Sequence, residues 1–439
     1  MSFILTVLSV IIIILLFVNF KYGFAVYLAY SILVPIGYLV INNFLIGEFF
    51  IFVLLLLAFI FRYIHKFSYF KFKLFTPFLF LLLGQFILIP FHNQTPFYYQ
   101  LNSFVHDMMG VTNSLILLNV ILLEQNSYKL YIKVIFISIA ISTFYGLFLT
   151  TIPGINPYLL ITLPIGGQEF NAAYAAGNSG LSDVLAIAAG RNFGRISSVF
   201  THPMTYGIFL CLSLVFMLYT VLKSKNKSAI ILLLFIVVNI FCIGVRTSIV
   251  VMIISLIYYL CFNYNIKKIF YTLFLAGIIY IIISNIIDTS SVFNSILSKD
   301  SDGVEGSSLN MRLEQLQGCF TIIDSHLILG NGYGWTSYYL SLHATHPLLL
   351  SFESLAFVIL CNNGLFGVLL WLVFIFMYFK ISYKFFTKEE SVVLQTLLVV
   401  YLCYSLITGE YGYMKYLVLY YAIFIGIFTN KKTKTSINI

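Results

Sequence analysis

The chain has 439 residues, of which 61% are hydrophobic and only 9% are charged, and its formal net charge is +9. A soluble globular domain carries about 25% charged residues, so this composition excludes a soluble enzyme, a disordered chain and a nucleic-acid-binding module. Uninterrupted apolar runs also exclude a transmembrane β-barrel, whose strands alternate apolar and polar residues. The chain is predicted to be an all-α polytopic integral membrane protein.

Thirteen apolar segments have about the length of 20 residues that a membrane-spanning helix needs. Two pairs of segments are tightly spaced, one around Lys21 and one around Arg246, so the expected total is about 12–13 helices. The segments are residues 3–20, 23–41, 44–61, 74–91, 107–123, 131–152, 203–222, 228–245, 247–262, 269–287, 355–379, 391–409 and 413–429.

Basic residues gather in alternate connections between these segments, which predicts the orientation of the chain. Eighteen of the 24 Lys and Arg fall on the side assigned to the cytoplasm, and twelve of the 15 acids fall on the other side. The N-terminus is therefore predicted to be external and the C-terminus cytoplasmic. The external cations include four arginines, and guanidinium binds phosphate bidentately. These arginines are Arg191, Arg195, Arg246 and Arg312.

Two long external connections divide the chain into segments. The second contains Leu309, Leu313, Leu316, Phe320 and Ile323. Their spacing predicts an amphipathic helix on the outer leaflet or against the bundle. The predicted segments are N-terminal membrane helices (1–152), a first long external loop (153–202), membrane helices with an external turn at Arg246 (203–287), a large external loop (288–346), and C-terminal membrane helices with a basic tail (347–439).

Arg195 and the sequence HPMTYG mark the place where the chain re-enters the membrane after the first long loop. One interpretation is an interfacial anchor followed by a helix that begins at Pro203. The other is a substrate-binding site in which Arg195 faces a lipid phosphate, with His202 and Tyr206 beside it.

Arg246 stands in CIGVRTSIV between two apolar runs, with no polar loop to shelter it. A charged residue at membrane depth is costly and suggests a function, although an arginine at a tight turn can also snorkel to the interface. Gly244, Thr247 and Ser248 would let backbone groups and hydroxyls approach an anion. A helix that starts at Thr247 would add its positive end.

The large loop contains Arg312, the glycine-rich sequence GNGYG, and then His343 and His346. Arg312 could instead balance the charge of Glu314, and each histidine could be structural. No acid or cysteine completes a metal site with suitable spacing, so neither a metal nor a cofactor is predicted. Glu353, near the start of the next span, could orient a histidine or bind a sugar hydroxyl.

The order of these motifs resembles the O-antigen ligase and Wzy-type polysaccharide polymerase superfamily. The resemblance covers about residues 190–375 and rests on Arg195 with HPMTYG, Arg246 in GVRTS, Arg312, GNGYG, His346 and the GLFG that begins at Gly364. His346 lies eighteen residues before Gly364, which is longer than the spacing usual in the family. His343 and Glu353 therefore remain alternative candidates.

The resemblance implies a glycosyltransferase at the outer face of the cytoplasmic membrane that uses a glycan on undecaprenyl pyrophosphate. Arg195, Arg246 and Arg312 would neutralise the pyrophosphate leaving group, and His346, His343 or Glu353 would take the proton of the attacking hydroxyl. A single, metal-independent displacement would invert the anomeric carbon. The implied partners are the lipid-linked glycan, the bilayer, a chain-length regulator and a flippase.

Polymerisation of repeat units into O-antigen or capsular polysaccharide is the favoured function. The Lys-, Asn-, Ile- and Phe-rich composition and the atypical histidine motif suit an enzyme built around one glycan. The first alternative is a ligase that transfers glycan to lipid A core. A flippase for lipid-linked oligosaccharides would need cations throughout the spans, and a structural scaffold would need Arg246 only for folding.

Overall fold

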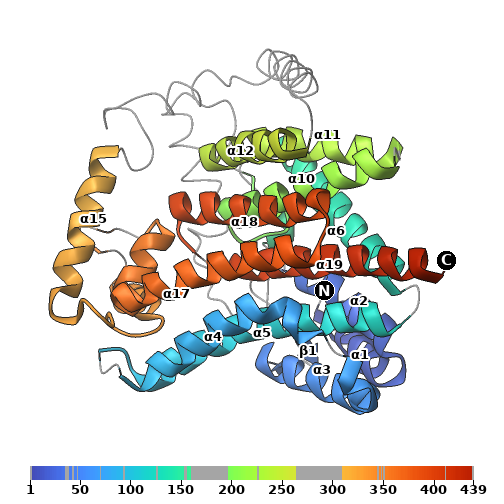
Figure 1. Ribbon diagram of the computed structural model, residues 1–439, viewed down its shortest axis with the longest axis horizontal. Coiled ribbons are helices and arrows are strands. Elements are labelled where there is room, and N and C mark those ends of the chain that lie inside the picture. Colours follow the sequence, from blue (N-terminus) through green and yellow to red (C-terminus); the bar gives the residue numbers. More distant parts are fainter. Residues whose placement is uncertain are drawn as a thin grey trace.

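The computed structural model describes residues 2–34, 39–159, 196–263 and 309–437, with gaps of one to three residues inside these ranges. Nearly all of the described chain is helical, and most helices run side by side (Figure 1). The longer helices are α1 (Ser2–Val18), α2 (Phe20–Leu33), α3 (Glu48–Tyr63), α4 (Thr76–Leu88), α5 (Phe97–Leu123), α6 (Ser127–Thr150), α10 (Pro203–Ser224), α11 (Lys227–Cys242), α12 (Arg246–Asn263), α15 (Leu309–Ile323), α17 (Leu355–Phe385), α18 (Lys388–Thr408) and α19 (Met414–Ile437).

The predicted fold class, an all-α polytopic membrane protein, is confirmed. Seven of the described helices are long and apolar enough to cross a membrane, and four shorter apolar helices accompany them. Twelve of the thirteen predicted spans coincide with a described helix, and the span predicted at 269–287 lies outside the described residues. Short 3₁₀ helices flank α3, α4 and α15, at Ile64–Tyr69 (η1), Phe72–Phe75 (η2), Ile89–Phe91 (η3) and Asp324–His326 (η4).

The second predicted span is too long at its end. Helix α2 stops at Leu33, and the next residue, Val34, is extended (φ −100°, ψ 114°). Val34 precedes Pro35, and the residue before a proline is pushed out of the α region. A short antiparallel hairpin of β1 (Leu39–Ile41) and β2 (Phe44–Ile46) then connects α2 to α3.

The fifth predicted span is too short at its start. Helix α5 begins at Phe97, ten residues before the apolar run predicted at 107–123. The added turns are polar and aromatic, so a search for apolar residues misses them. As a consequence His106 and Asp107 lie within a continuous helix rather than at its edge.

Helices α10, α18 and α19 form the centre of the bundle. Nearly every side chain of α19 between Leu417 and Ile425 is buried, as are most of those in α10 and α18. Tyrosines satisfy their polar ends inside this core, as buried tyrosines generally must. Tyr420 Oη lies 2.6 Å from Ser213 Oγ on α10, and Tyr421 Oη donates to Leu74 O at 2.7 Å.

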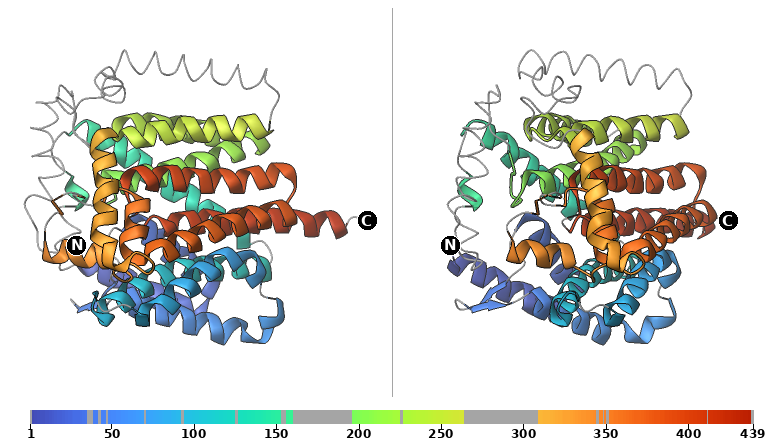
Figure 2. Two further views of the ribbon diagram at one scale, coloured as in Figure 1. Left: turned by 60° about the vertical axis from the view of Figure 1, so that its left-hand side comes forward. Right: turned by 90° about the vertical axis from the view of Figure 1, so that its left-hand side faces the viewer.

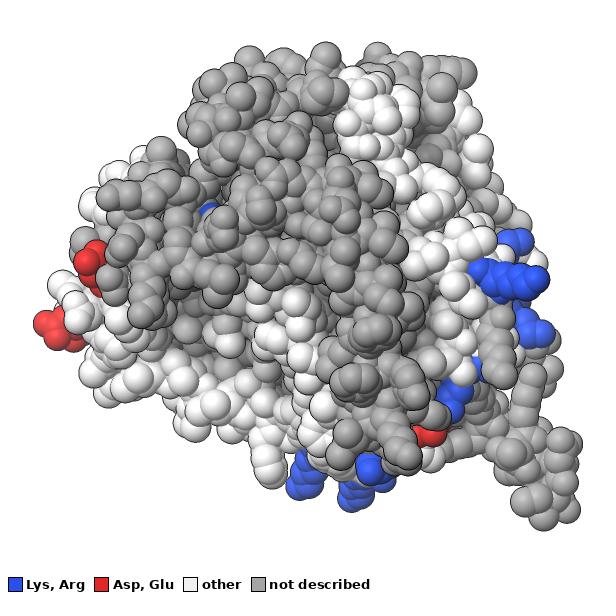
Figure 3. All heavy atoms as spheres, turned by 90° about the horizontal axis from the view of Figure 1, so that it is seen from above, with Lys and Arg blue, Asp and Glu red and all other residues white. Residues whose placement is uncertain are grey.

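The connections predicted to be cytoplasmic meet at one end of the bundle. Lys223 and Glu389 form an ion pair there at 2.5 Å, and Tyr131 Oη donates to Lys21 O at 3.2 Å. Blue lysines and arginines gather mainly toward the end where the C-terminus lies in Figure 1, and red acids lie at the opposite end, with a further red patch among the blue residues (Figure 3). We call these the basic end and the acidic end.

Helix α15 confirms the amphipathic helix predicted in the large loop. It lies across the acidic end of the bundle, transverse to the membrane helices (Figure 2). Gln315, Cys319 and Ile323 are buried, and Cys319 Sγ lies 3.9 Å from Cys361 Sγ of α17. Leu313 and Phe320, on the other side of α15, are exposed.

Candidate functional site

The long helix α17 is interrupted at Gly364. The backbone there has φ 58° and ψ −153°, which a residue with a Cβ rarely adopts. A break leaves backbone carbonyls before it and N–H groups after it without partners in the helix, and such groups are costly in a membrane. Gly364 is the first glycine of GLFG, so this motif lies at the break.

The glycine-rich turn of the large loop supplies the missing backbone partners. Residues 327–332 lie against residues 361–366 of α17, and we call this contact the glycine clasp. Four hydrogen bonds cross it, two in each direction. They run from Asn331 N to Cys361 O (2.9 Å), from Gly332 N to Asn362 O (2.8 Å), from Leu365 N to Leu327 O (3.0 Å) and from Phe366 N to Ile328 O (3.0 Å).

The clasp depends on glycine at two facing positions. A Cβ at Gly364 would lie 2.6 Å from Leu327 O, and a Cβ at Gly330 would lie 2.6 Å from Asn362 O and from Gly364 N. These distances are shorter than an ordinary contact between a Cβ and a backbone atom. The two glycine motifs that the sequence analysis singled out are therefore one structural unit.

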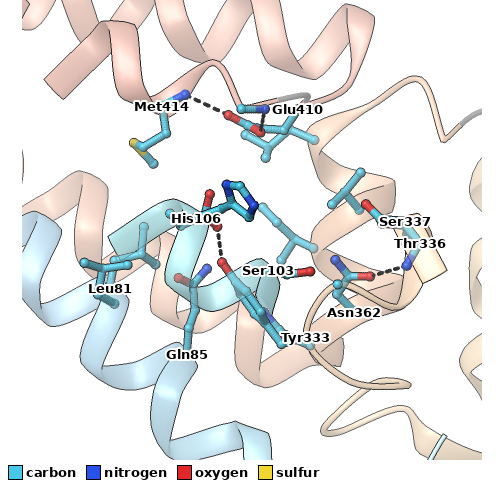
Figure 4. A pocket seen from close by; sticks show the side chains of 18 of the residues that line it. Leu81, Gln85, Ser103, His106, Tyr333, Thr336, Ser337, Asn362, Glu410 and Met414 are labelled. Atoms are coloured by element: carbon cyan, nitrogen blue, oxygen red, sulfur yellow. Dashed lines mark hydrogen bonds between the residues drawn. The ribbon is translucent and has the colours of Figure 1, made fainter. Parts of the chain in front are cut away.

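Beside the clasp, a cavity of about 490 Å³ opens between α4, α5, α17 and the turn that joins α18 to α19 (Figure 4). Its remaining wall is the glycine-rich turn together with the start of α16 (Trp335–Leu342). The polar and aromatic side chains that line it are Phe78, Gln85, Tyr99, Asn102, Ser103, His106, Asp107, Tyr333, Thr336, Ser337, Asn362, Asn363, Trp371, Tyr401 and Glu410.

Asp107 projects from α5 toward the glycine-rich turn. Its Oδ2 accepts a hydrogen bond from the hydroxyl of Tyr333, the tyrosine of GNGYG. Burial, together with the negative charges of Asp107 and Glu410, raises the pKa of Tyr333 well above 10. The phenol therefore keeps its proton and remains a donor to Asp107.

Glu410 faces the same cavity from the turn between α18 and α19. Its Oε1 accepts hydrogen bonds from Met414 N (2.8 Å) and from Tyr401 Oη (3.3 Å), and its Oε2 accepts one from Gly412 N (2.7 Å). These donors fix the orientation of the carboxyl. Burial raises the pKa of Glu410, so it binds a proton at higher pH than an exposed glutamate does.

None of the three residues predicted as the base lines this cavity. His346 packs against Tyr339 and Phe352, with ring centroids 5.1 and 5.8 Å apart. His343, at the end of α16, is exposed, and its ring is tilted against that of Tyr339 with centroids 4.7 Å apart. Glu353 is half-buried, just before α17. The structure brings the two histidines together around one tyrosine, and all three assignments stay predictions.

The ring of His346 is oriented by the backbone. Its Nδ1 accepts a hydrogen bond from Leu349 N at 3.1 Å, so the neutral ring carries its proton on Nε2. Burial lowers the pKa of His346. The neutral ring therefore persists to lower pH than that of an exposed histidine. Before His346 can accept a proton at Nδ1, its hydrogen bond from Leu349 N has to break.

Arg246 is half-buried at the first residue of α12, immediately after the turn at Gly244 (φ 69°). The helix was predicted to begin one residue later. This position puts Arg246 in the first turn of α12, and the N-terminus of a helix attracts anions. Ser248 Oγ lies 3.4 Å from Tyr404 Oη, and the Tyr404 ring lies 5.8 Å from that of Tyr413 in the Glu410 turn. The Arg246 turn and the cavity thus share the acidic end.

The other predicted substrate-binding residues are placed as follows. Arg195 lies outside the described residues, as does most of the first long loop, and for Arg312 only its helix, α15, is described. His202 precedes α10 and its Nδ1 accepts from Met204 N at 3.2 Å, so it caps the helix that Pro203 begins. Tyr206 is buried, and its hydroxyl contacts Ser142 O (3.0 Å) and Asn239 Oδ1 (2.9 Å). The roles of all four stay predictions.

Sequence reasoning missed the residues that line the cavity. Asp107 on α5, Asn363 on α17 and Glu410 in the α18–α19 turn are far apart in the chain, and the packing of α5 along α19 brings Asp107 and Glu410 together. One signal was available, because acids near membrane depth are costly and tend to be functional. Among the described residues no three His, Cys, Asp or Glu side chains form a group that could hold a metal ion.

Comparison with known families identifies one segment of the chain. Residues 230–372 match the family model of the O-antigen ligase. The segment runs from α11 to the middle of α17 and contains Arg246, Arg312, His346 and the glycine clasp. No curated protein matches the chain. The resemblance predicted from the order of motifs is confirmed over this segment, which supports an activity of the O-antigen ligase or polymerase type.

Proposed function

Because residues 230–372 carry the O-antigen ligase family domain, we propose that this membrane protein polymerises lipid-linked oligosaccharide repeat units into O-antigen or capsular polysaccharide. The donor is a glycan on undecaprenyl pyrophosphate, and the acceptor is the terminal sugar of another repeat unit. The reaction takes place at the outer face of the cytoplasmic membrane, at the acidic end of the bundle.

The observation that carries the proposal is the position of Arg246 at a helix N-terminus within the matched segment. Cleavage of the bond between sugar and pyrophosphate leaves negative charge on the leaving group. A guanidinium and helix N–H groups aimed at that charge lower the barrier electrostatically. Arg195 and Arg312 are proposed to contribute further positive charge, and a chain-length regulator and a flippase are proposed as partners.

The proton of the attacking hydroxyl goes to a base, for which we propose His346, with His343 and Glu353 as alternatives. The hydroxyl oxygen forms a bond to the anomeric carbon as the bond to pyrophosphate breaks, and the configuration inverts. General-base catalysis of this kind contributes typically 10²–10⁴-fold.

The proposal is tested by removing the gene and separating the surface polysaccharide on a gel. We expect the ladder to collapse to core plus one repeat unit. Complete loss of glycan from the core, with accumulation of lipid-linked polymer, supports the ligase alternative. An unchanged ladder contradicts both activities and favours the flippase or scaffold alternatives.

Replacing His346 with alanine is expected to remove activity, whereas replacing His326 with alanine is not. His326 is the matched control, because it lies in the same loop and its Nδ1 contacts only its neighbour Ser325, at 2.7 Å, among the described residues. In the native protein, activity should fall only as the pH drops below 6.5, through the lowered pKa of His346. Normal chain extension by both variants would place the base elsewhere.

A further inference from the structure

The cavity beside the glycine clasp has the wrong charge for a pyrophosphate. Two carboxyls, Asp107 and Glu410, line it, and none of its described lining residues is Lys or Arg. Its other titratable side chains are His106 on α5, Tyr333 on the turn and Tyr99 and Tyr401. The ammonium of the nearby Lys415 lies 5.1 Å from the centroid of the Tyr416 ring. A phosphate would meet repulsion here, whereas a neutral or amine-bearing group would not.

The polar groups of the cavity match the hydroxyls of a sugar. Carboxylates and side-chain amides accept or donate hydrogen bonds at several points, and Gln85, Asn102, Ser103 and Ser337 add to the two acids. Tyr99 and Trp371 add apolar aromatic surface, on which the C–H face of a sugar ring can lie. A concave site with a few placed polar groups on an apolar wall is typical of small-ligand binding.

Asn363 independently indicates that the cavity binds a ligand. It lines the cavity next to the helix break, and only 3% of its surface is exposed. Its Oδ1 has no hydrogen-bond partner among the described residues. A buried polar atom without a partner is costly in a folded protein. A donor from a bound ligand, such as a sugar hydroxyl, would remove that cost.

Hydrogen bonds orient both carboxyls. The donors to Glu410 come from its own turn and from Tyr401, and they hold the carboxyl toward the cavity (Figure 4). Asp107 accepts a hydrogen bond from Tyr333 through Oδ2. Because Tyr333 belongs to the glycine-rich turn, the clasp sets the position of this donor.

We propose that this cavity is a saccharide-binding site, in which Asp107, Glu410 and Asn363 hold hydroxyl or amino groups of a sugar ring, separate from the pyrophosphate site at Arg246. The inference rests on the proposed function for the identity of the glycan. It adds a recognition site built by α5, α17 and the α18–α19 turn, of which only part of α17 lies in the matched segment. The sugar belongs to the non-reducing end of the acceptor or to the reducing end of the donor.

The chain offers a direct optical test, because it contains two tryptophans and Trp371 lines the cavity. In a Trp335→Phe background, purified protein in lipid nanodiscs is titrated with methyl glycosides of the two end sugars of the repeat unit. Isothermal calorimetry on the unmodified protein measures the same binding without relying on fluorescence. We expect one glycoside to bind saturably and to change the Trp371 emission, and inorganic pyrophosphate to leave that emission unchanged. The glycoside that binds identifies the acceptor or the donor as the source of the sugar.

The variants Asp107→Asn, Glu410→Gln and Asn363→Leu are expected to weaken glycoside binding about 10-fold or more, because each removes a hydrogen bond to a buried site. Glu389→Gln is the matched control, since Glu389 is exposed at the basic end, and it should bind like the native protein. Arg246→Lys should also leave glycoside affinity unchanged.

Three outcomes would overturn the site: no heat of binding with either glycoside at millimolar concentration, native affinity in all three cavity variants, or a Trp371 response to pyrophosphate. These results are independent of the gel experiment. An unchanged ladder in the deletion strain contradicts the polymerase function, whereas native binding by the cavity variants contradicts only the saccharide site.

Discussion

Replacing Arg246 with alanine is expected to abolish glycan chain extension while the amount of protein in the membrane stays normal. Arg246 is half-buried at the first residue of α12, and the N-terminus of a helix attracts anions. Removing one preorganised donor to a developing negative charge typically costs about 10²–10³ in rate. A gel of surface polysaccharide from the complemented deletion strain measures the effect.

The conservative variant separates geometry from charge. Arg246→Lys keeps the positive charge but loses the planar pair of donors that binds phosphate bidentately, so it should fail as well. Lys415→Ala is the control for a loss of charge at the same end of the bundle, and it should retain the ladder. Full activity of the lysine variant would remove the bidentate role, and full activity of the alanine variant would leave Arg246 as a snorkelling residue.

The second large effect is expected on folding, from Gly364→Ala. The new Cβ would lie 2.6 Å from Leu327 O and 2.7 Å from Gly330 N, and the backbone conformation (φ 58°, ψ −153°) is itself unfavourable for alanine. Strain at such a position costs about 1–3 kcal/mol before any contact is counted. We expect a lower unfolding temperature in detergent and loss of protein from the membrane, with a similar loss for Gly330→Ala.

A third glycine separates the cost of the backbone conformation from the cost of the close Cβ contact. Gly412 also has a positive φ (76°), but a Cβ there would meet nothing within 4 Å. Gly412→Ala should therefore show the conformational cost alone, about 1–2 kcal/mol. If Gly364→Ala unfolds at the same temperature as Gly412→Ala, the close backbone contact of the glycine clasp does not contribute to stability.

Hydropathy was enough to predict the membrane helices and the amphipathic helix α15, because both follow from the local spacing of apolar residues. It could not place the start of α5, since the turns from Phe97 to His106 are helical without being apolar. The break at Gly364 was equally hidden, because the hydrogen bonds that stabilise it join residues thirty or more positions apart in the chain.

The candidate site, too, could be predicted from the sequence only in part. The order of motifs led to Arg246 and to the two glycine sequences because each is recognisable over a few residues. Asp107 and Glu410 stand some three hundred positions apart in the chain. Only the packing of α5 against α19 makes them neighbours, and a single sequence carries no local pattern for that contact.

The glycine clasp also constrains how the protein is made. Residues 327–332 leave the ribosome before residues 361–366. The N–H groups of Leu365 and Phe366, just after the break, donate to Leu327 O and Ile328 O, so they find these partners only when the earlier segment is in place. Without that segment they would remain unpaired at the break, which is costly in lipid. We therefore expect stable insertion of α17 to depend on prior placement of the glycine-rich turn at the same end of the bundle.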